Sequence, residues 1–474
     1  MKIAPCLICL GFGITLLGAA QLFAARGPAR GPAGGAAAAP AGPTEFKFDF
    51  SAGPAKDGYT KVAPTAVYSP EAGFGFEPGA AIASGDSGDV ATSEKPFFFS
   101  VKVPEGNYNV TITLGDSATA TTTTVKLESG RIMAEKWTVP AGKTSTRTFT
   151  TNVRTPQLPA IPNNAPGRSI VSMDQFDSGN SRDWDDKLNI EINSSHAALR
   201  TIEISAAPTA PTVFLASDST VTDRDGGADV SWGAVLSLFL KPGVAVSNQA
   251  QSGETLKSFA NALRLDKILS QMKKGDYLFI QFAHNDSKAS WPQTYVEPAT
   301  TYKAYLKVYI AEAQRRGATP VLVTSMDRVN FGGPGGTTTN SHGGFPAAMR
   351  EVAKEENVAL IDLQLMSEKF YPAVGQANAK KISGDNTHTV IYGGYELAKC
   401  IVMGIKQNKL DLAKFIVDDF ADFDPAHPDP IESVDIPASP SNPGGGRGAR
   451  GGNPAAGRGA ASGVPAGDPG PGPL

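Results

Sequence analysis

Residues 211–221, "PTVFLASDSTV", decide the fold of the second half of the chain. The apolar run before Asp218 has the length and composition of a strand that is buried on both faces. Ser219 follows this run directly, either as a turn hydroxyl or as the nucleophile of a hydrolase. Gly-Asp-Ser also occurs at 85–87, in a glycine-rich loop without a preceding strand, and at 115–117, before a β-branched run that predicts another strand. Position in the chain therefore favours Ser219.

Further apolar runs alternate with helical patterns after Ser219. The runs are "VAVSN" (244–248), "DYLFIQFA" (276–283), "TPVLVTS" (319–325) and "VALIDL" (358–363). Between them, apolar residues recur at helical spacing, as in 232–240 and 302–310. The alternation predicts an α/β domain over 210–422, with a parallel sheet and helices on both faces. Ligands bind beyond the carboxyl ends of such strands, which selects Asp218-Ser219, Asn248 and His284-Asn285-Asp286.

Residues 46–207 follow a different pattern, in which apolar and polar residues alternate with a period of two. The clearest runs are "FFFSVKV" (97–103), "YNVTITL" (108–114), "LNIEIN" (188–193) and "RTIEIS" (200–205). Gly, Pro and Asn separate these runs. The pattern predicts an antiparallel β-sandwich domain in front of the α/β domain.

The two ends of the chain differ in composition from the rest. Residues 1–25 predict a cleaved signal peptide and therefore a secreted or periplasmic protein. A Gly/Pro/Ala-rich linker at 26–45 and a Pro/Gly-rich tail at 423–474 are expected to be disordered. No membrane span is expected after signal cleavage, and Cys400 is expected to be buried in a helix. The net charge of -3 predicts no nucleic-acid partner.

A serine nucleophile needs a base that accepts its proton. The chain has five histidines, and three lie in the α/β pattern: His284, His342 and His388. Asp385 stands three residues before His388, so its carboxylate is a candidate for orienting that imidazole. His284 and His342 are then candidates for substrate contacts.

Acyl transfer also needs hydrogen-bond donors that face the developing oxyanion. Asn285 offers a side-chain amide at a strand end, and Gly253 offers a backbone N–H at a point without a side chain. The backbone N–H of Ser219 is the third candidate donor. Taken singly, Asn285 and Gly253 are also common turn residues.

Asp218-Ser219, Gly253, Asn285 and Asp385-x-x-His388 stand in the order found in the SGNH, or GDSL-type, hydrolases, and the chain resembles that family. Several short stretches of the sequence are most similar to the rhamnogalacturonan acetylesterase group. The similar segments are "SNQAQSGETLKSF" (247–259), "FIQFAHND" (279–286) and "DNTHTVIYGGYELAK" (385–399). The leading β domain resembles a galactose-binding-like module.

The resemblance implies a flavodoxin-like fold and a serine esterase that removes acetyl groups from a plant cell-wall polysaccharide, either pectic rhamnogalacturonan or xylan. It implies Ser219 as nucleophile, His388 as general base and Asp385 as its orienting partner. Ser219, Gly253 and Asn285 would form the oxyanion hole, and no metal or organic cofactor is implied. The residues expected to contact the acetylated substrate are His284, Trp232, Glu254 and His342.

Three positions depart from the family pattern. Ser217 and Ala283 replace glycines, from which we expect a narrower pocket. Glu254 stands where pectin-acting members tend to have arginine, which weakens the pectic assignment and keeps xylan or another neutral glycan open. These departures also motivate a second hypothesis, a carbohydrate-binding protein with impaired catalysis.

Two further classes of enzyme remain open at this point. One is a lipase-type GDSL esterase, which would need an apolar tunnel for the acyl chain. The other is a zinc hydrolase in which Asp385, His388 and His284 converge on a metal, although the sequence has no zinc motif such as His-Glu-x-x-His. The oligomeric state is not predicted.

Overall fold

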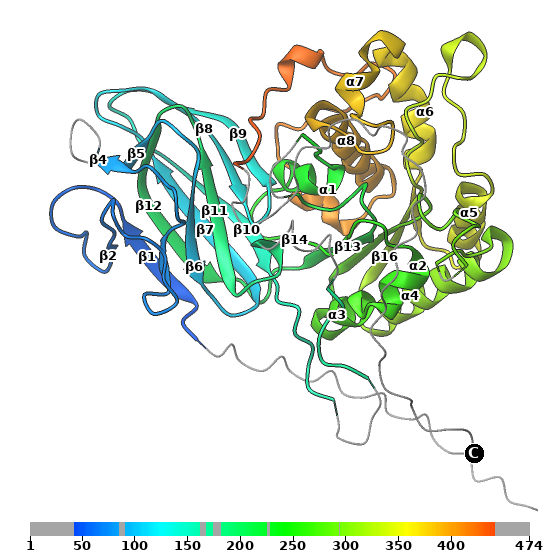
Figure 1. The fold of residues 1–474 in the computed structure, drawn as a ribbon, viewed down its shortest axis with the longest axis horizontal. Coiled ribbons are helices and arrows are strands. Elements are labelled where there is room, and N and C mark those ends of the chain that lie inside the picture. The colour runs from blue at the N-terminus through cyan, green and yellow to red at the C-terminus, as the bar shows by residue number, and fades with distance from the viewer. Residues whose placement is uncertain are drawn as a thin grey trace, which may run out of the picture. The chain divides into compact units, whose positions relative to one another are not determined.

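In the computed structural model, the apolar runs after residue 211 form a five-stranded parallel sheet (Figure 1). The structure describes residues 42–84, 91–161, 167–173, 182–224, 228–292 and 294–440. The strands are β13 (Thr212–Ser217), β14 (Ala245–Asn248), β15 (Tyr277–Gln281), β16 (Thr319–Val323) and β17 (Ala359–Ile361). They pair in the order β14-β13-β15-β16-β17. This is the flavodoxin-like order 2-1-3-4-5, and the predicted α/β fold is confirmed.

Successive residues of β13 point to opposite faces of this sheet, and both faces are covered by helices. Val213 and Leu215 pack in one apolar cluster with α1, α6 and α8, whereas Phe214 and Ala216 pack in another with α2 to α5. The two groups of helices lie on either side of the sheet in Figure 1. The helices are α1 (Trp232–Val235), α2 (Leu256–Asn261), α3 (Arg264–Gln271), α4 (Lys303–Arg315), α5 (Phe345–Glu355), α6 (Leu363–Val374), α7 (Ala379–Ile382) and α8 (Ile391–Gln407).

The alternating runs before residue 207 form the predicted sandwich of two mainly antiparallel sheets. One has the order β10-β7-β12-β1-β2, with β5 on β12 and β4 on β5, and the other has the order β3-β6-β11-β8-β9. Phe48 and Ile112 of the first sheet meet Phe99 and Ile190 of the second in one apolar core. The strands are β1 (Glu45–Asp49), β2 (Thr60–Lys61), β3 (Phe74–Phe76), β4 (Ala83–Ser84), β5 (Ala91–Ser93), β6 (Phe97–Lys102), β7 (Gly106–Leu114), β8 (Thr121–Leu127), β9 (Arg131–Val139), β10 (Ser145–Val153), β11 (Lys187–Asn193) and β12 (Ala197–Ala206).

The two domains belong to one compact unit. Ile132 of β9 is a member of the apolar cluster that also contains Val213 and Leu215, so the sandwich contributes to the core of the α/β domain. Tyr395 of α8 donates a hydrogen bond to Glu135 of β9 over 3.0 Å. The domain interface is therefore continuous with the hydrophobic core.

Part of the predicted disordered tail is ordered structure, so the expectation for 423–440 is wrong. Phe423 and Ile436 are buried in the α/β core, and the Lys126 ammonium of β8 donates to the Pro437 carbonyl. In a tail rich in Pro and Gly, isolated apolar residues form no periodic pattern, so the sequence does not reveal that they are buried. The predicted signal peptide at 1–25 lies outside the described residues. Within those residues, no helix has the length and apolar character needed to cross a membrane.

Candidate active site

Ser219 and His388 meet at the carboxyl edge of the parallel sheet. Ser219 follows β13, and His388 lies in the loop between α7 and α8. His388 Nε2 is 2.9 Å from Ser219 Oγ, and His388 Nδ1 is 2.7 Å from Asp385 Oδ2. A base within hydrogen-bond reach of a hydroxyl, and itself oriented by a carboxylate, is the arrangement that activates a serine nucleophile.

The loop that carries His388 is shaped by Asp385. Asp385 Oδ1 accepts hydrogen bonds from the backbone N–H groups of Thr387 and His388, over 3.0 and 2.8 Å. Burial raises the pKa of Asp385, but the backbone and side-chain hydrogen bonds of His388 and the N–H of Thr387 outweigh burial and lower it to about 2. Asp385 is therefore a carboxylate at neutral pH, and it faces Nδ1 of the His388 ring.

The position of Ser219 follows from the strand order. β13 lies between β14 and β15, where the order of the strands reverses, and a crevice forms at such a switch point. The turn after β13 is closed by Asp218, whose Oδ1 accepts from the N–H and the hydroxyl of Thr220 over 2.9 and 2.7 Å. This turn leaves the Ser219 side chain at the edge of the sheet.

Asn285 follows β15, on the other side of the same switch point. Its Nδ2 donates to the backbone carbonyl of Glu254 over 3.0 Å, and its Oδ1 accepts from the Lys288 ammonium over 2.7 Å. Gly253, which precedes Glu254 in an exposed turn, has a φ of 85°, a conformation that favours glycine. The Gly253 turn and Asn285 therefore adjoin each other beside the nucleophile loop.

Both domains of the chain match known protein families. Residues 217–389 match the GDSL-like Lipase/Acylhydrolase family, and residues 46–158 match a family described as Beta-agarase/YXIM esterase-like, galactose-binding domain-like. The Probable rhamnogalacturonan acetylesterase YesY of Bacillus subtilis (strain 168) is 37% identical over 212 residues, which cover 43% of this chain and 97% of that protein. The chain belongs to the GDSL-like lipase/acylhydrolase family.

Two other relatives of this acylhydrolase come from the same organism. Rhamnogalacturonan acetylesterase RhgT is 34% identical over 222 residues, which cover 43% of this chain and 94% of that protein. Uncharacterized esterase YxiM is 24% identical over 392 residues, which cover 77% of this chain and 92% of that protein. The family resemblance that the sequence predicts is therefore confirmed for both domains.

All four side chains that we expected to contact substrate directly are buried in the acylhydrolase, which argues against direct contact. Trp232 is 1% exposed, and its indole N–H donates to Gln281 over 3.0 Å inside the core. His284 and His342 are 1% and 2% exposed, and their rings pack against each other. Burial lowers the pKa of His284 well below its usual range, so it is a neutral support behind the nucleophile turn, 3.8 Å from Asp218.

Glu254 does not present its carboxylate to the substrate either. Its Oε1 lies 3.5 Å from Nε of the fully buried Arg264, and its Oε2 accepts a hydrogen bond from Ser258. The negative charge is thereby compensated inside the domain. Because Glu254 is paired with Arg264, its charge is no longer a reason to weaken the pectic assignment.

The side chains at the two departures from glycine, Ser217 and Ala283, make contacts within the sheet and the apolar core. The Ser217 hydroxyl points along the sheet and donates to the Gln281 carbonyl at the end of β15. Ala283 packs in the apolar cluster on the α2-to-α5 face of the sheet. Which face a residue takes at a strand end depends on the register between strands, so a single sequence does not reveal it.

Three cations near Ser219 were missed by the sequence reasoning. Arg224 donates to the Ser219 carbonyl over 3.1 Å, Lys288 contacts Asn285, and Arg328 donates to the His284 carbonyl over 3.4 Å and to Thr387. Lys288 and Arg328 follow the carboxyl ends of β15 and β16. The strand-end rule that selected Asn285 would have found them, had it been extended to cations.

Proposed function

We propose that this acylhydrolase is an exported serine esterase that removes acetyl groups from a plant cell-wall polysaccharide. The observation that carries the proposal is the hydrogen-bonded series Ser219–His388–Asp385. The names of YesY and RhgT, both rhamnogalacturonan acetylesterases, support acetyl as the acyl group. Residues 1–25 support export through their pattern of a signal peptide.

The reaction would proceed in two acyl-transfer steps. His388 Nε2 takes the proton of Ser219 Oγ as this oxygen attacks the acetyl carbonyl, and the oxyanion accepts from the N–H groups of Ser219 and Gly253 and from Asn285 Nδ2. The intermediate then collapses, and His388 gives the proton to the departing sugar oxygen. Water, deprotonated by His388, attacks the acetyl-serine, and acetate leaves while Ser219 regains its proton.

Charge around the site supports an acidic backbone such as rhamnogalacturonan over neutral xylan. Arg224, Lys288 and Arg328 place positive charge near Ser219, whereas the charge of Glu254 is compensated by Arg264. Such a field attracts a polyanion and weakens with salt. Xylan remains the second candidate, and it predicts an activity that salt does not change.

The decisive measurement is acetate release from acetylated rhamnogalacturonan, xylan and mannan, with wild type beside Ser219→Ala. We expect release from rhamnogalacturonan by wild type, inhibition of that release by salt, and no release by the variant. A fluorophosphonate probe should label wild type and leave Ser219→Ala unlabelled. A folded wild type that neither releases acetate nor reacts with the probe would favour the carbohydrate-binding hypothesis instead.

Export has its own test. Expressed from its full gene in a bacterial host, the protein should be recovered outside the cytoplasm with an N-terminus near residue 26. Mass spectrometry of the intact chain measures this directly. A full-length chain retained in the cytoplasm would contradict the proposal.

A further inference from the structure

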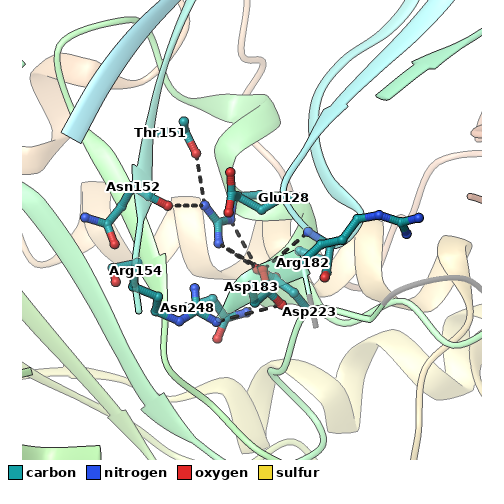
Figure 2. Close-up of polar contacts among 12 residues, drawn as sticks. Glu128, Thr151, Asn152, Arg154, Arg182, Asp183, Asp223 and Asn248 are labelled. Atoms are coloured by element: carbon teal, nitrogen blue, oxygen red, sulfur yellow. Dashed lines mark hydrogen bonds and ion pairs between the residues drawn. The ribbon is translucent and has the colours of Figure 1, made fainter. Parts of the chain in front are cut away.

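A buried ionic cluster joins the sandwich to the loop that carries the nucleophile (Figure 2). Its centre is Arg131, the first residue of β9, which is fully buried. Arg131 Nε and Nη2 lie 3.2 and 2.8 Å from Oδ2 of Asp223, a residue that is itself 1% exposed. Asp223 stands four residues after Ser219 in the chain. The sandwich therefore contacts the nucleophile loop through a charge pair shielded from water.

Arg131 is fixed on its other side by strand β10. Its Nη1 donates to the Thr151 hydroxyl over 3.0 Å and to the Asn152 carbonyl over 3.4 Å. Burial would lower the pKa of Arg131, but Asp223, Asp183 and Glu128 outweigh it and raise that pKa. The guanidinium is thus a permanent charge with a fixed orientation, and its planar fork matches this set of acceptors.

A relay of hydrogen bonds runs from Asp223 through Asn248 to the backbone beside Ser219. Asp223 Oδ1 accepts from Asn248 Nδ2 over 2.7 Å, and the same amide nitrogen donates to the Val221 carbonyl over 2.6 Å. Figure 2 shows Asp183, Asp223 and Asn248 gathered at one place in this cluster. Val221 is two residues from Ser219. The position of Val221 therefore depends on Asp223, and through it on Arg131.

The neighbouring residue of the sandwich makes a backbone contact with the same loop. Gly130 has a φ of 77°, and a Cβ at this position would lie 2.6 Å from the Arg224 carbonyl oxygen. Arg224 in turn donates from its guanidinium to the Ser219 carbonyl over 3.1 Å. Two consecutive residues of the sandwich thus meet two consecutive residues of the nucleophile loop.

We propose that Arg131 of the sandwich is a positioning residue for Ser219, which acts through Asp223 and Asn248. The sandwich then contributes to the position of the nucleophile. Misplacement of a reacting group by about 1 Å can lower a rate by about a hundredfold, so a loose nucleophile loop would reduce the rate of acylation. The inference rests on the proposed role of Ser219 as nucleophile.

The test compares Arg131→Met with Lys267→Met in the full chain. Lys267 is a matched control because its buried ammonium also pairs across the domain interface, 2.6 Å from Glu105 of the sandwich, outside the relay. We expect Arg131→Met to lower kcat for 4-nitrophenyl acetate and the rate of fluorophosphonate labelling by about tenfold or more, with KM unchanged. Lys267→Met should lower the melting temperature and leave kcat unchanged. If Arg131→Met lowers only the melting temperature, the positioning role is wrong.

A milder pair of variants decides the matter if Arg131→Met does not fold. Thr151→Val removes one acceptor of Arg131, and Tyr395→Phe removes one hydroxyl that bonds to Glu135 on the same strand, β9. We expect the kcat of Thr151→Val to fall and that of Tyr395→Phe to stay at the wild-type value. Equal kcat in both would overturn the inference. A wild type without acetate release or labelling would instead count against the proposed function, so the two failures are distinguishable.

Discussion

His388 Nε2 lies 2.9 Å from Ser219 Oγ, although 169 residues separate these residues in the chain. The contact exists because β13 ends beside Ser219 and because the loop before α8 returns to the same edge of the sheet. Asp385 adds the third member at 2.7 Å. The reactivity of Ser219 should therefore depend on side chains that never touch the substrate.

Replacing Asp385 by Asn should disable the base without unfolding the domain. An amide at this position no longer stabilises the imidazolium and allows the wrong tautomer, so kcat should fall by about 10²–10⁴-fold. His427 and Asp424 offer a matched control, because they form a similar pair three residues apart, 2.9 Å between Nδ1 and Oδ2, on the exposed surface. Kinetics on 4-nitrophenyl acetate should find Asp424→Asn as active as wild type. Comparable activities of both variants would exclude Asp385 from catalysis.

Lys288 should fix the orientation of the Asn285 amide. An ammonium has only donors, so it faces the amide oxygen and turns Nδ2 the other way. In Lys288→Met we expect kcat to fall by about tenfold, part of the 10²–10³ lost when an oxyanion donor is removed. Lys288→Arg retains a donor and should recover most of the rate in steady-state assays. A Met variant with wild-type kcat would show that Asn285 needs no such support.

Glu254→Arg tests whether this position selects the glycan or stabilises the domain. The new guanidinium would face the buried Arg264, and breaking a buried ion pair costs about 3–5 kcal/mol. We expect a lower melting temperature and no lower KM for acetylated rhamnogalacturonan. Glu432→Arg makes the same charge change at an exposed position and should leave the melting temperature unchanged. A stable Glu254→Arg variant with a lowered KM would contradict this expectation.

Asp286 should make stability depend on pH. Burial, the first cause, raises the pKa of Asp286 to about 8, so the folded state keeps a proton that the unfolded state loses near pH 4. Stability therefore falls as pH rises from about 4 to 8, by at most about 1.4 kcal/mol per pH unit for this group. Asp286→Asn is always neutral, so urea unfolding should find its advantage over wild type growing from pH 5 to pH 8. Parallel stability curves for wild type and Asp286→Asn would refute the assignment.

The strands were predictable because the regular spacing of their apolar residues is visible in a single sequence. The runs at 97–103 and 276–283 form β6 and β15. The rule that ligands bind beyond the carboxyl ends of parallel strands pointed to Ser219 and Asn285. Local chemistry was also accessible: Asp116 of the second Gly-Asp-Ser copy bonds the N–H groups of Ala118 and Thr119, as a turn residue does. The first copy, 85–87, lies outside the described residues.

Side-chain direction and long-range charge pairing were not predictable in the same way. Trp232 and His342 look like substrate contacts in the sequence, yet both side chains are buried in the structure. Arg131 and Asp223 are 92 residues apart and belong to no periodic pattern. Such pairs depend on how two domains meet, and a single sequence carries no signal for that.

The segment 423–440 has a consequence for how the chain is made. The Lys126 ammonium donates to the carbonyl of Pro437, which lies 311 positions further along the chain. The Asn193 amide donates to the carbonyl of Ala438, 245 positions further along. On a ribosome, the sandwich would emerge long before these acceptors. Its final contacts would then form only after the whole α/β domain has been synthesised.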